Sequence, residues 1–161
     1  MSKIKPQVPG KLYERWLAGH VAPKICPDTS VFSSTRTPVV YVVDDDPDVL
    51  NSLGFLLEND GFEVRTFRSG EALLGTPTTN SADCFVIDYR MPSMTGIELA
   101  ELLRNRKIDA PIILITGYPG QNIRANAAAS GICRVLFKPL VDESLTTHIW
   151  NAINAGRPPS C

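Results

Sequence analysis

The chain has 161 residues, of which 43% are hydrophobic, and its 16 basic side chains nearly balance its 17 acidic ones. This length and composition are typical of one globular domain with a modest surplus of chain. The near-neutral balance argues against a dedicated nucleic-acid-binding protein, and the longest apolar run, Val39–Val43, is far shorter than a membrane-spanning helix, so we expect a cytoplasmic protein without membrane contact.

The first 37 residues form a basic segment with little capacity for a hydrophobic core. They carry six basic and two acidic residues, a net charge of +4, whereas residues 38–161 carry ten basic and fifteen acidic residues, a net charge of −5. Residues 1–38 also hold five of the 13 prolines. We therefore expect residues 1–37 to be a disordered N-terminal extension, which either docks on a partner or is an unselected leader.

From residue 39 onward, short apolar runs alternate with segments of helical periodicity, which is typical of repeated strand–helix units. Strands are predicted at 39–43, 62–67, 84–87, 112–115 and 134–137. Helices are predicted at about 47–60, 69–74, 95–106, 121–130 and 142–155. This alternation predicts an α/β fold, a flavodoxin-like doubly wound parallel sheet. We assign residues 38–157 to this domain and 158–161 to a C-terminal tail.

Capping signals mark where several of these helices begin and end. Asp46 is a predicted N-cap, because Pro47 follows it at the first helical position. Thr95 and Glu98 have the spacing of a capping box. Gly61 is the expected stop of the first helix, and Asp142 is the expected cap of the last.

Acidic residues follow the first and third predicted strands. Asp44, Asp45 and Asp46 come directly after the first strand, and Asp88 comes after the third. In this fold the carboxyl ends of these two strands meet at the topological switch point, where ligands bind. Converging carboxylates repel each other unless a cation neutralises them, and hard divalent ions prefer oxygen ligands. The sequence therefore predicts a Mg²⁺ site.

Two further polar residues end the fourth and fifth strands. Thr116 supplies a hydroxyl, and Lys138, followed by Pro139, supplies a positive charge. A metal, a hydroxyl and an ammonium around one carboxylate suit a group with three anionic oxygens, which is a phosphoryl group in transfer.

Four segments together resemble the receiver domain of two-component response regulators. They are Val42–Pro47 (VVDDDP), Phe85–Gly96 (FVIDYRMPSMTG), Ile112–Gly117 (IILITG) and Phe137–Pro139 (FKP). The resemblance covers about residues 38–156, and within the family it is closest to the nitrogen-fixation regulators. It implies five strands in the order 2-1-3-4-5 with five helices.

The resemblance implies a role for each acidic residue of the site. Asp88 would be the nucleophile that accepts a phosphoryl group from a phosphohistidine of a sensor histidine kinase or a histidine phosphotransfer protein. Asp45 would bind Mg²⁺ directly, and Asp44 directly or through water. Asp88 and the backbone carbonyl of Arg90 would supply further metal ligands.

The resemblance also implies roles for the residues that end the last two strands. Thr116 would donate a hydrogen bond to the phosphoryl group, and Lys138 would pair with Asp88 or its phosphate. The Lys138–Pro139 peptide would be cis. Such a domain is a signalling phosphoacceptor rather than an enzyme that acts on other substrates, although it assists its own phosphorylation and dephosphorylation.

One position departs from the family pattern. Val135 stands three residues before Lys138, where the family usually carries the Tyr or Phe of a rotamer switch. Phe137 is the nearby aromatic, and we expect its side chain on the face of the strand opposite to that of Val135. We hypothesise that Tyr118 and Arg90 flank the phosphoryl pocket and set how easily water hydrolyses the acyl phosphate.

Two alternatives remain open from the residues. A haloacid-dehalogenase-type phosphatase also uses a strand-end aspartate with Mg²⁺, but it needs an acid where this chain has Arg90. A degenerate receiver that binds a partner without phosphorylation is compatible with Val135. Because the chain stops at Cys161, where the resembled regulators usually continue into a DNA-binding domain, we expect output through an unidentified protein partner or a phosphorylation-dependent homodimer.

Overall fold

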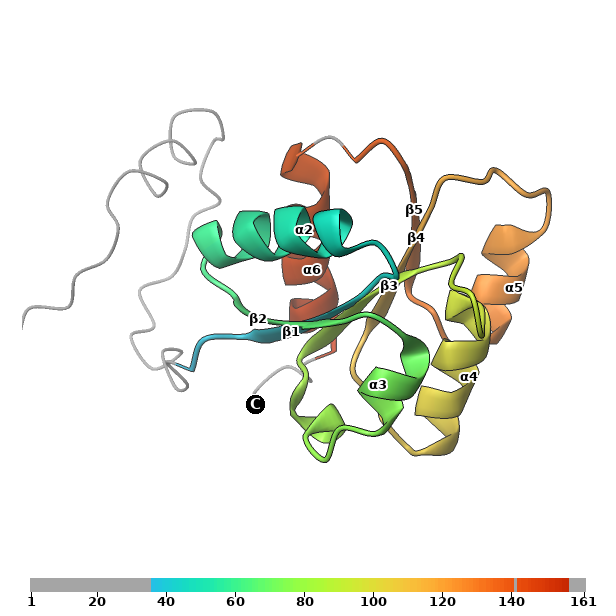
Figure 1. Ribbon diagram of the computed structural model, residues 1–161, viewed down its shortest axis with the longest axis horizontal. Coiled ribbons are helices and arrows are strands. Elements are labelled where there is room, and N and C mark those ends of the chain that lie inside the picture. The colour runs from blue at the N-terminus through green and yellow to red at the C-terminus, as the bar shows by residue number, and fades with distance from the viewer. Residues whose placement is uncertain (1–35, 141, 157–161) are drawn as a thin grey trace, which may run out of the picture. The chain divides into compact units, whose positions relative to one another are not determined.

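The computed structural model of the chain describes residues 36–140 and 142–156, in which five strands alternate with five α-helices (Figure 1). The strands are β1 (Val39–Val43), β2 (Glu63–Phe67), β3 (Cys84–Asp88), β4 (Ile112–Thr116) and β5 (Arg134–Phe137). The helices are α2 (Pro47–Asn59), α3 (Gly70–Leu74), α4 (Gly96–Asn105), α5 (Ile123–Ala129) and α6 (Asp142–Ala155). The expected N-terminal extension, apart from residues 36 and 37, and the expected tail lie outside the described residues.

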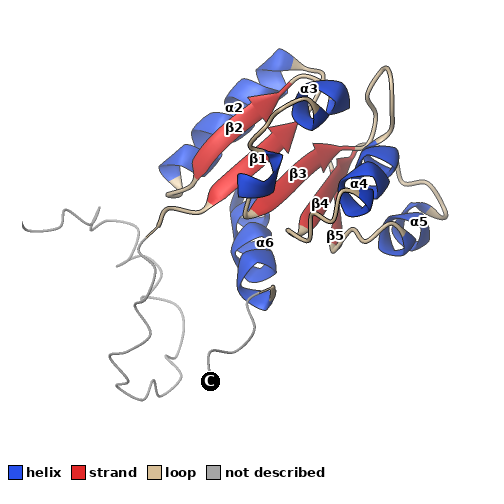
Figure 2. Cartoon of the chain, turned by 90° about the horizontal axis from the view of Figure 1, so that it is seen from below, coloured by secondary structure: helices blue, strands red, loops and turns tan. Residues whose placement is uncertain are grey.

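All neighbouring strands pair in parallel, in the order β2-β1-β3-β4-β5 (Figure 2). This order confirms the flavodoxin-like topology. The chain adds β2 on one side of β1 and β3, β4 and β5 on the other, so the order of connection reverses between β1 and β3, which are hydrogen-bonded neighbours. The carboxyl ends of β1, β3 and β4 therefore lie side by side at one edge of the sheet.

Helices cover both faces of the sheet and divide the core into two layers. Helices α2 and α6 pack on one face through residues such as Leu57 and Ile149. Helices α3, α4 and α5 pack on the other through residues such as Leu73, Leu103 and Ala127. Among the described residues, no helix is both long enough and apolar enough to span a membrane.

The three central strands are buried on both faces, which explains their continuous apolar sequences. Every residue of β1, β3 and β4 is buried. Full burial of each Val, Leu or Ile side chain contributes about 1.5–3 kcal/mol. This central support holds the strand ends, and the polar residues on them, in fixed positions.

The predicted signals at the ends of α2 and at the start of α4 are present. The Asp46 carboxylate accepts a hydrogen bond from the backbone N–H of Asp48 at 2.9 Å, and Pro47 opens α2. Thr95 and Glu98 form the complete capping box of α4. Gly61 follows α2 with a φ of +92°, a left-handed conformation that suits glycine.

The structure differs from the sequence-based boundaries at a few element ends. β2 begins at Glu63, because the backbone N–H of Phe62 donates to the carbonyl of Leu57 at the end of α2 instead of to a neighbouring strand. A 3₁₀ helix, Thr79–Ser81, was not expected. α6 begins at Asp142, so this residue lies in the first turn of the helix rather than before it.

Candidate functional site

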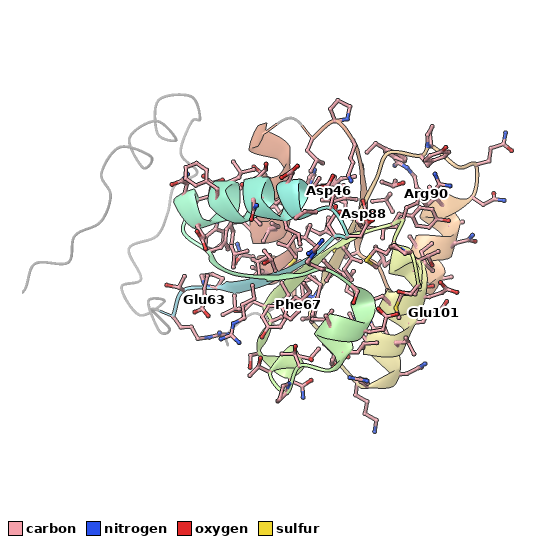
Figure 3. All side chains as sticks on the ribbon, in the orientation of Figure 1. Asp46, Glu63, Phe67, Asp88, Arg90 and Glu101 are labelled. Atoms are coloured by element: carbon pink, nitrogen blue, oxygen red, sulfur yellow. The ribbon has the colours of Figure 1, made fainter. Side chains whose placement is uncertain are left out.

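Three carboxylates converge at the carboxyl ends of β1 and β3. Asp44 and Asp45 follow β1, Asp88 ends β3, and one oxygen atom from each lies within 4.8 Å of the others. Asp44 and Asp88 are only 4% and 8% exposed. Figure 3 shows Asp88 with Asp46 and Arg90 at this edge of the sheet. The acidic cluster that the sequence predicts is therefore assembled by the fold.

Lys138 neutralises part of this acidic cluster. Its Nζ atom donates a hydrogen bond to Asp88 Oδ1 at 2.8 Å and lies 3.6 Å from Asp44 Oδ2. Burial alone would lower the pKa of Lys138, but the hydrogen bond and the negative charge of Asp88, with a further contribution from Asp44, raise it above its ordinary value. The ammonium group is thus fixed in its charged form beside Asp88.

Backbone N–H groups orient two of the carboxylates. The N–H of Asp46 donates to Asp44 Oδ1 at 2.9 Å, and the N–H of Arg90 donates to Asp88 Oδ2 at 2.8 Å. Burial raises the pKa of Asp44; the hydrogen bond from Asp46 opposes this rise, and the charge of Asp88 adds to it. Each oxygen of Asp88 therefore has one donor, Lys138 or the backbone of Arg90.

Thr116 lies at the end of β4 and is 1% exposed. Its hydroxyl oxygen accepts a hydrogen bond from the backbone N–H of Tyr118 at 3.0 Å. Its carbonyl accepts one from the backbone N–H of Lys138 at 2.8 Å, which ties the two strand ends together. The Lys138–Pro139 peptide is cis, as the resemblance implied.

These side chains line one open cavity of about 310 Å³. Its wall consists of Asp44, Asp45, Asp46, Val49, Asp88, Arg90, Thr116, Gly117, Tyr118 and Lys138. Every side chain that the sequence predicts for the site is in this wall. The cavity combines carboxylates with a hydroxyl and two cationic groups, which can bind a group with several anionic oxygens.

The donor set of the cavity fits Mg²⁺. The three clustered carboxylates are hard oxygen ligands, and two of them are buried. One ammonium group cannot neutralise three carboxylates, so a divalent cation would relieve the remaining repulsion. Asp44, Asp45 and Asp88 are the side chains that would hold the ion, and the backbone carbonyl of Arg90 could add a fourth ligand.

Arg90 and Tyr118 form a pair at the mouth of this cavity. The Arg90 guanidinium carbon lies 4.2 Å from the centre of the Tyr118 ring, within the range of a cation–π contact. Tyr118 is 58% exposed. The two residues that were expected to flank the pocket are therefore in direct contact with each other.

The expected position of Phe137 is wrong. Val135 and Phe137 both pack against the core layer beneath α4 and α5, whereas Leu136 packs against the opposite layer. The reason is the two-residue alternation of a strand, which puts residues 135 and 137 on the same face. Val135 stands where the resembled family usually carries an aromatic residue, and the aromatic ring of Phe137 lies one strand period further along on the same face.

Sequence reasoning also missed a contact between α5 and β5. The Arg124 guanidinium carbon lies 5.0 Å from the centre of the Phe137 ring. Alternation along β5 could have indicated which face Phe137 occupies. Only the packing of α5 against the sheet shows that Arg124 covers it.

The comparisons with known sequences agree with the geometry of the site. The family model of the response regulator receiver domain matches residues 40–150. The transcriptional regulatory protein FixJ of Bradyrhizobium diazoefficiens is 36% identical over 119 residues, 74% of this chain and 58% of FixJ. The response regulator protein TodT of Pseudomonas putida is 31% identical over 120 residues, 74% of this chain and 53% of TodT. The chain thus spans about half the length of these curated relatives.

Solved structures show the same fold. A response regulator receiver domain protein from Clostridium thermocellum superposes with a TM-score of 0.69 at 30% identity, covering 73% of this chain and 95% of that one. The receiver domain of the Francisella response regulator 1452 gives a TM-score of 0.70 at 26% identity, covering 75% of this chain and all of that one (100%).

Proposed function

Because the chain belongs to the family of response regulator receiver domains, we propose that Asp88 accepts a phosphoryl group in a Mg²⁺-dependent phosphorelay. The observation that carries this proposal is the position of Asp88 between Lys138 and the Asp44–Asp45 pair in one cavity. We further propose that residues 38–157 form the receiver and that it acts in the cytoplasm.

The donor is a phosphohistidine of a sensor histidine kinase or of a histidine phosphotransfer protein. A carboxylate oxygen of Asp88 attacks the phosphorus atom, and a P–O bond forms as the P–N bond of the phosphohistidine breaks. The electron pair of the broken bond returns to the imidazole nitrogen. The product is an acyl phosphate on Asp88, which water later hydrolyses.

The protein's contribution to this transfer is orientation and charge. Lys138 and the backbone N–H of Arg90 hold the two oxygens of Asp88, which fixes the carboxylate in the cavity. Lys138 then faces the negative charge that develops on the transferring oxygens. Thr116 lines the same cavity, and its hydroxyl is the candidate donor to a phosphoryl oxygen.

Mg²⁺ bound by Asp44, Asp45 and Asp88 would neutralise charge on the phosphoryl group and on the cluster itself. Because the transfer needs mainly neutralisation of charge, it needs little covalent assistance from other side chains of the protein. We therefore propose that the domain acts as a phosphoacceptor and assists only its own phosphorylation and dephosphorylation.

The signal leaves the domain through a conformational change that a protein partner recognises, or through a phosphorylation-dependent homodimer. The surface of residues 121–155 is the candidate, because Thr116 is hydrogen-bonded to Lys138 within this segment and to Tyr118 shortly before it.

A second candidate function is binding of a partner without phosphorylation. Val135 favours it, because a valine cannot act as the aromatic switch that the family usually has at this position. The complete set of Asp88, Lys138 and the acidic pair favours phosphorylation instead.

Acetyl phosphate discriminates between the two functions. With Mg²⁺, we expect the intact protein to gain the mass of one phosphoryl group, and we expect Asp88→Asn or removal of Mg²⁺ to prevent the gain. Absence of any gain at saturating acetyl phosphate, with Mg²⁺ binding demonstrated separately, would favour the phosphorylation-independent module.

A further inference from the structure

A second open cavity adjoins the acidic cavity. It lies between the loops that follow β3 and β4 and the start of α5 (Figure 1). Its volume is about 530 Å³, against about 310 Å³ for the acidic cavity, and only Arg90 and Tyr118 belong to both walls. We call it the tyrosine cavity, and its wall consists of Tyr89, Arg90, Met91, Thr95, Tyr118, Gly120, Asn122, Ile123 and Asn126.

The floor of the tyrosine cavity is apolar and partly aromatic. Met91 and Ile123 are only 9% and 7% exposed, and Tyr89 is half-buried, so these side chains form its inner surface. Tyr118 adds a second ring at the mouth of the cavity, where it is exposed. Aromatic rings stack on other rings, and a thioether makes favourable contacts with them. The floor is therefore suited to a flat, aromatic ligand.

Arg90 is the one charged side chain in this wall. Among the residues that the structure describes, it forms no ion pair with an aspartate or glutamate. Its contact with the Tyr118 ring orients the guanidinium group without neutralising its charge. Such a group can bind a carboxylate through two parallel hydrogen bonds.

Two side-chain amides add uncharged hydrogen-bonding groups to the wall. Asn122 precedes α5 and Asn126 lies one helical turn further on, so both are on the same side of the helix. Within the described part of the chain, neither side chain forms a hydrogen bond. Each amide offers both donors and an acceptor to a polar group of a ligand.

We propose that the tyrosine cavity binds a small aromatic carboxylic acid of one or two fused rings. Its carboxylate pairs with Arg90, its rings lie against the aromatic and apolar floor, and a polar substituent is hydrogen-bonded by Asn122 or Asn126. The volume of the cavity falls in the range of about 300–1,000 Å³ that is typical of small-molecule sites. One guanidinium group balances one carboxylate, so the complex buries no unpaired charge.

Other occupants fit this wall less well. A nucleotide carries two or more negative charges on its phosphates, whereas the wall has a single cationic group. A divalent cation finds no carboxylate in the wall, and a basic ligand would be repelled by Arg90. Charge complementarity therefore favours a ligand with one negative charge.

This inference goes beyond phosphorylation and does not depend on it. The backbone N–H of Tyr118 donates to the hydroxyl of Thr116, so the ligand would lie beside the proposed phosphorylation site. Binding is nevertheless measured without Mg²⁺ and without a phosphodonor. Failure of phosphorylation at Asp88 would leave this measurement unaffected, and the two proposals can fail separately.

The probe is a hydroxynaphthoate, with its carboxylate and its hydroxyl at opposite ends of two fused rings. Binding to the full chain is followed through backbone amide chemical shifts. We expect saturable shifts of the amides of Met91, Ile123 and Asn126. The corresponding carboxamide lacks the charge and should bind about tenfold more weakly. The fully saturated analogue keeps the carboxylate but lacks the aromatic rings, and it should bind severalfold more weakly.

Charge variants test the role assigned to Arg90. Arg90→Gln should weaken binding of the acid by about tenfold and leave binding of the carboxamide unchanged, because only the acid uses the guanidinium charge. Arg68→Gln is the matched control, since it removes an exposed positive charge outside the cavity. It should leave both affinities unchanged.

Gly120 permits a variant that fills the cavity without changing its charge. A Cβ atom at this position would lie 4.0 Å from the Cβ atom of Ile123, so a side chain fits there without a clash. Gly120→Leu should abolish binding of the probe, whereas the smaller change Gly120→Ala should retain most of it. The dispersion of the amide spectrum shows whether each variant is folded.

Three results with the probe would overturn the inference. They are equal binding of the acid and the carboxamide, shifts confined to the acidic cavity, and no shift at millimolar probe. Stronger binding of adenosine monophosphate at the same amides would also overturn it and identify a nucleotide site. Stronger binding of a peptide with a C-terminal tryptophan would overturn it in favour of a protein terminus as the ligand.

Discussion

Phe137 lies directly opposite Thr116 in the parallel pairing of β5 with β4. Register partners in a parallel sheet project to the same face, and Leu114 and Val135, one strand period earlier, both pack toward α5. Phe137 is also covered by Arg124 of α5. The aromatic ring of Phe137 is therefore in contact with α5, a helix of the proposed output surface.

This relationship predicts that Phe137, rather than Val135, transmits a change at Thr116 to α5. A phosphoryl analogue such as beryllofluoride should shift the amides of α5 in the wild-type protein. In Phe137→Leu the response should be reduced by about half or more, because the leucine keeps apolar volume but gives Arg124 no ring to stack on. Val135→Ala is the matched change on the same face and should retain the response. The reverse pattern would refute this route.

The Arg90–Tyr118 pair predicts a change in the lifetime of the acyl phosphate. The pair lies at the mouth of the cavity, so Arg90→Ala or Tyr118→Ala should open it to water and shorten the lifetime severalfold. Loss of a partly exposed cation–π contact of about 0.5–1 kcal/mol corresponds to a factor of about 2 to 5. The check is the decay of phosphorylated protein after removal of the donor; an unchanged lifetime in both variants would exclude this role.

The ion pairs of Lys138 with the acidic cluster lead us to expect that the free energy of unfolding of a Lys138 variant depends on Mg²⁺. In Lys138→Met the free energy of unfolding without Mg²⁺ should fall by about 1–2 kcal/mol, because the buried carboxylates lose their cation. This loss is smaller than that expected for a fully buried ion pair, because the Lys138 side chain is 36% exposed. Urea denaturation measures it, and Mg²⁺ should restore more stability to the variant than to the wild type. The double variant Asp88→Asn/Lys138→Met is the control and should lose less stability than Lys138→Met alone.

The capping box of α4 predicts a pH-dependent contribution to stability. The backbone N–H and then the hydroxyl of Thr95 lower the pKa of Glu98 below its ordinary value of 4.5. A lowered pKa stabilises the folded state above that ordinary value, and the contribution disappears as the pH falls through the folded-state pKa. Glu98→Gln should therefore be less stable than the wild type near neutral pH and approach it in acid.

Thr95→Ala tests the other half of the same box. It should lower the free energy of unfolding by about 1 kcal/mol near neutral pH, because it removes the side chain that caps the N–H of Glu98. Thermal or urea unfolding of the two variants from acid to neutral pH provides the measurement. A Glu98→Gln deficit that does not diminish in acid would contradict the assignment.

Most of the site could be predicted because it depends on local sequence signals and one topological rule. Asp44, Asp45, Asp88 and Thr116 each lie at the end of a buried apolar run, and parallel strands bring such ends to one edge. The cap at Asp46 was equally local, since it needs only the residues that follow it.

Contacts between elements could not be predicted in the same way. The Arg124–Phe137 contact joins α5 to β5, and the Arg90–Tyr118 contact joins two loops. Both therefore depend on tertiary packing. The face occupied by Phe137, in contrast, follows from the two-residue alternation of a strand, which places Phe137 on the same face as Val135. The boundary of β2 differs from the expected one because the backbone N–H of Phe62 is bonded to the end of α2, a contact that the strand-like sequence does not reveal.

The central claim is that Asp88 carries the phosphoryl group. After reaction with acetyl phosphate and Mg²⁺, borohydride reduces an acyl phosphate to an alcohol, which converts the modified aspartate to homoserine and marks it for peptide sequencing by mass spectrometry. We expect homoserine at residue 88 in samples with Mg²⁺ and no homoserine in samples without Mg²⁺. Homoserine at Asp44 or Asp45 with an unmodified Asp88 would contradict it.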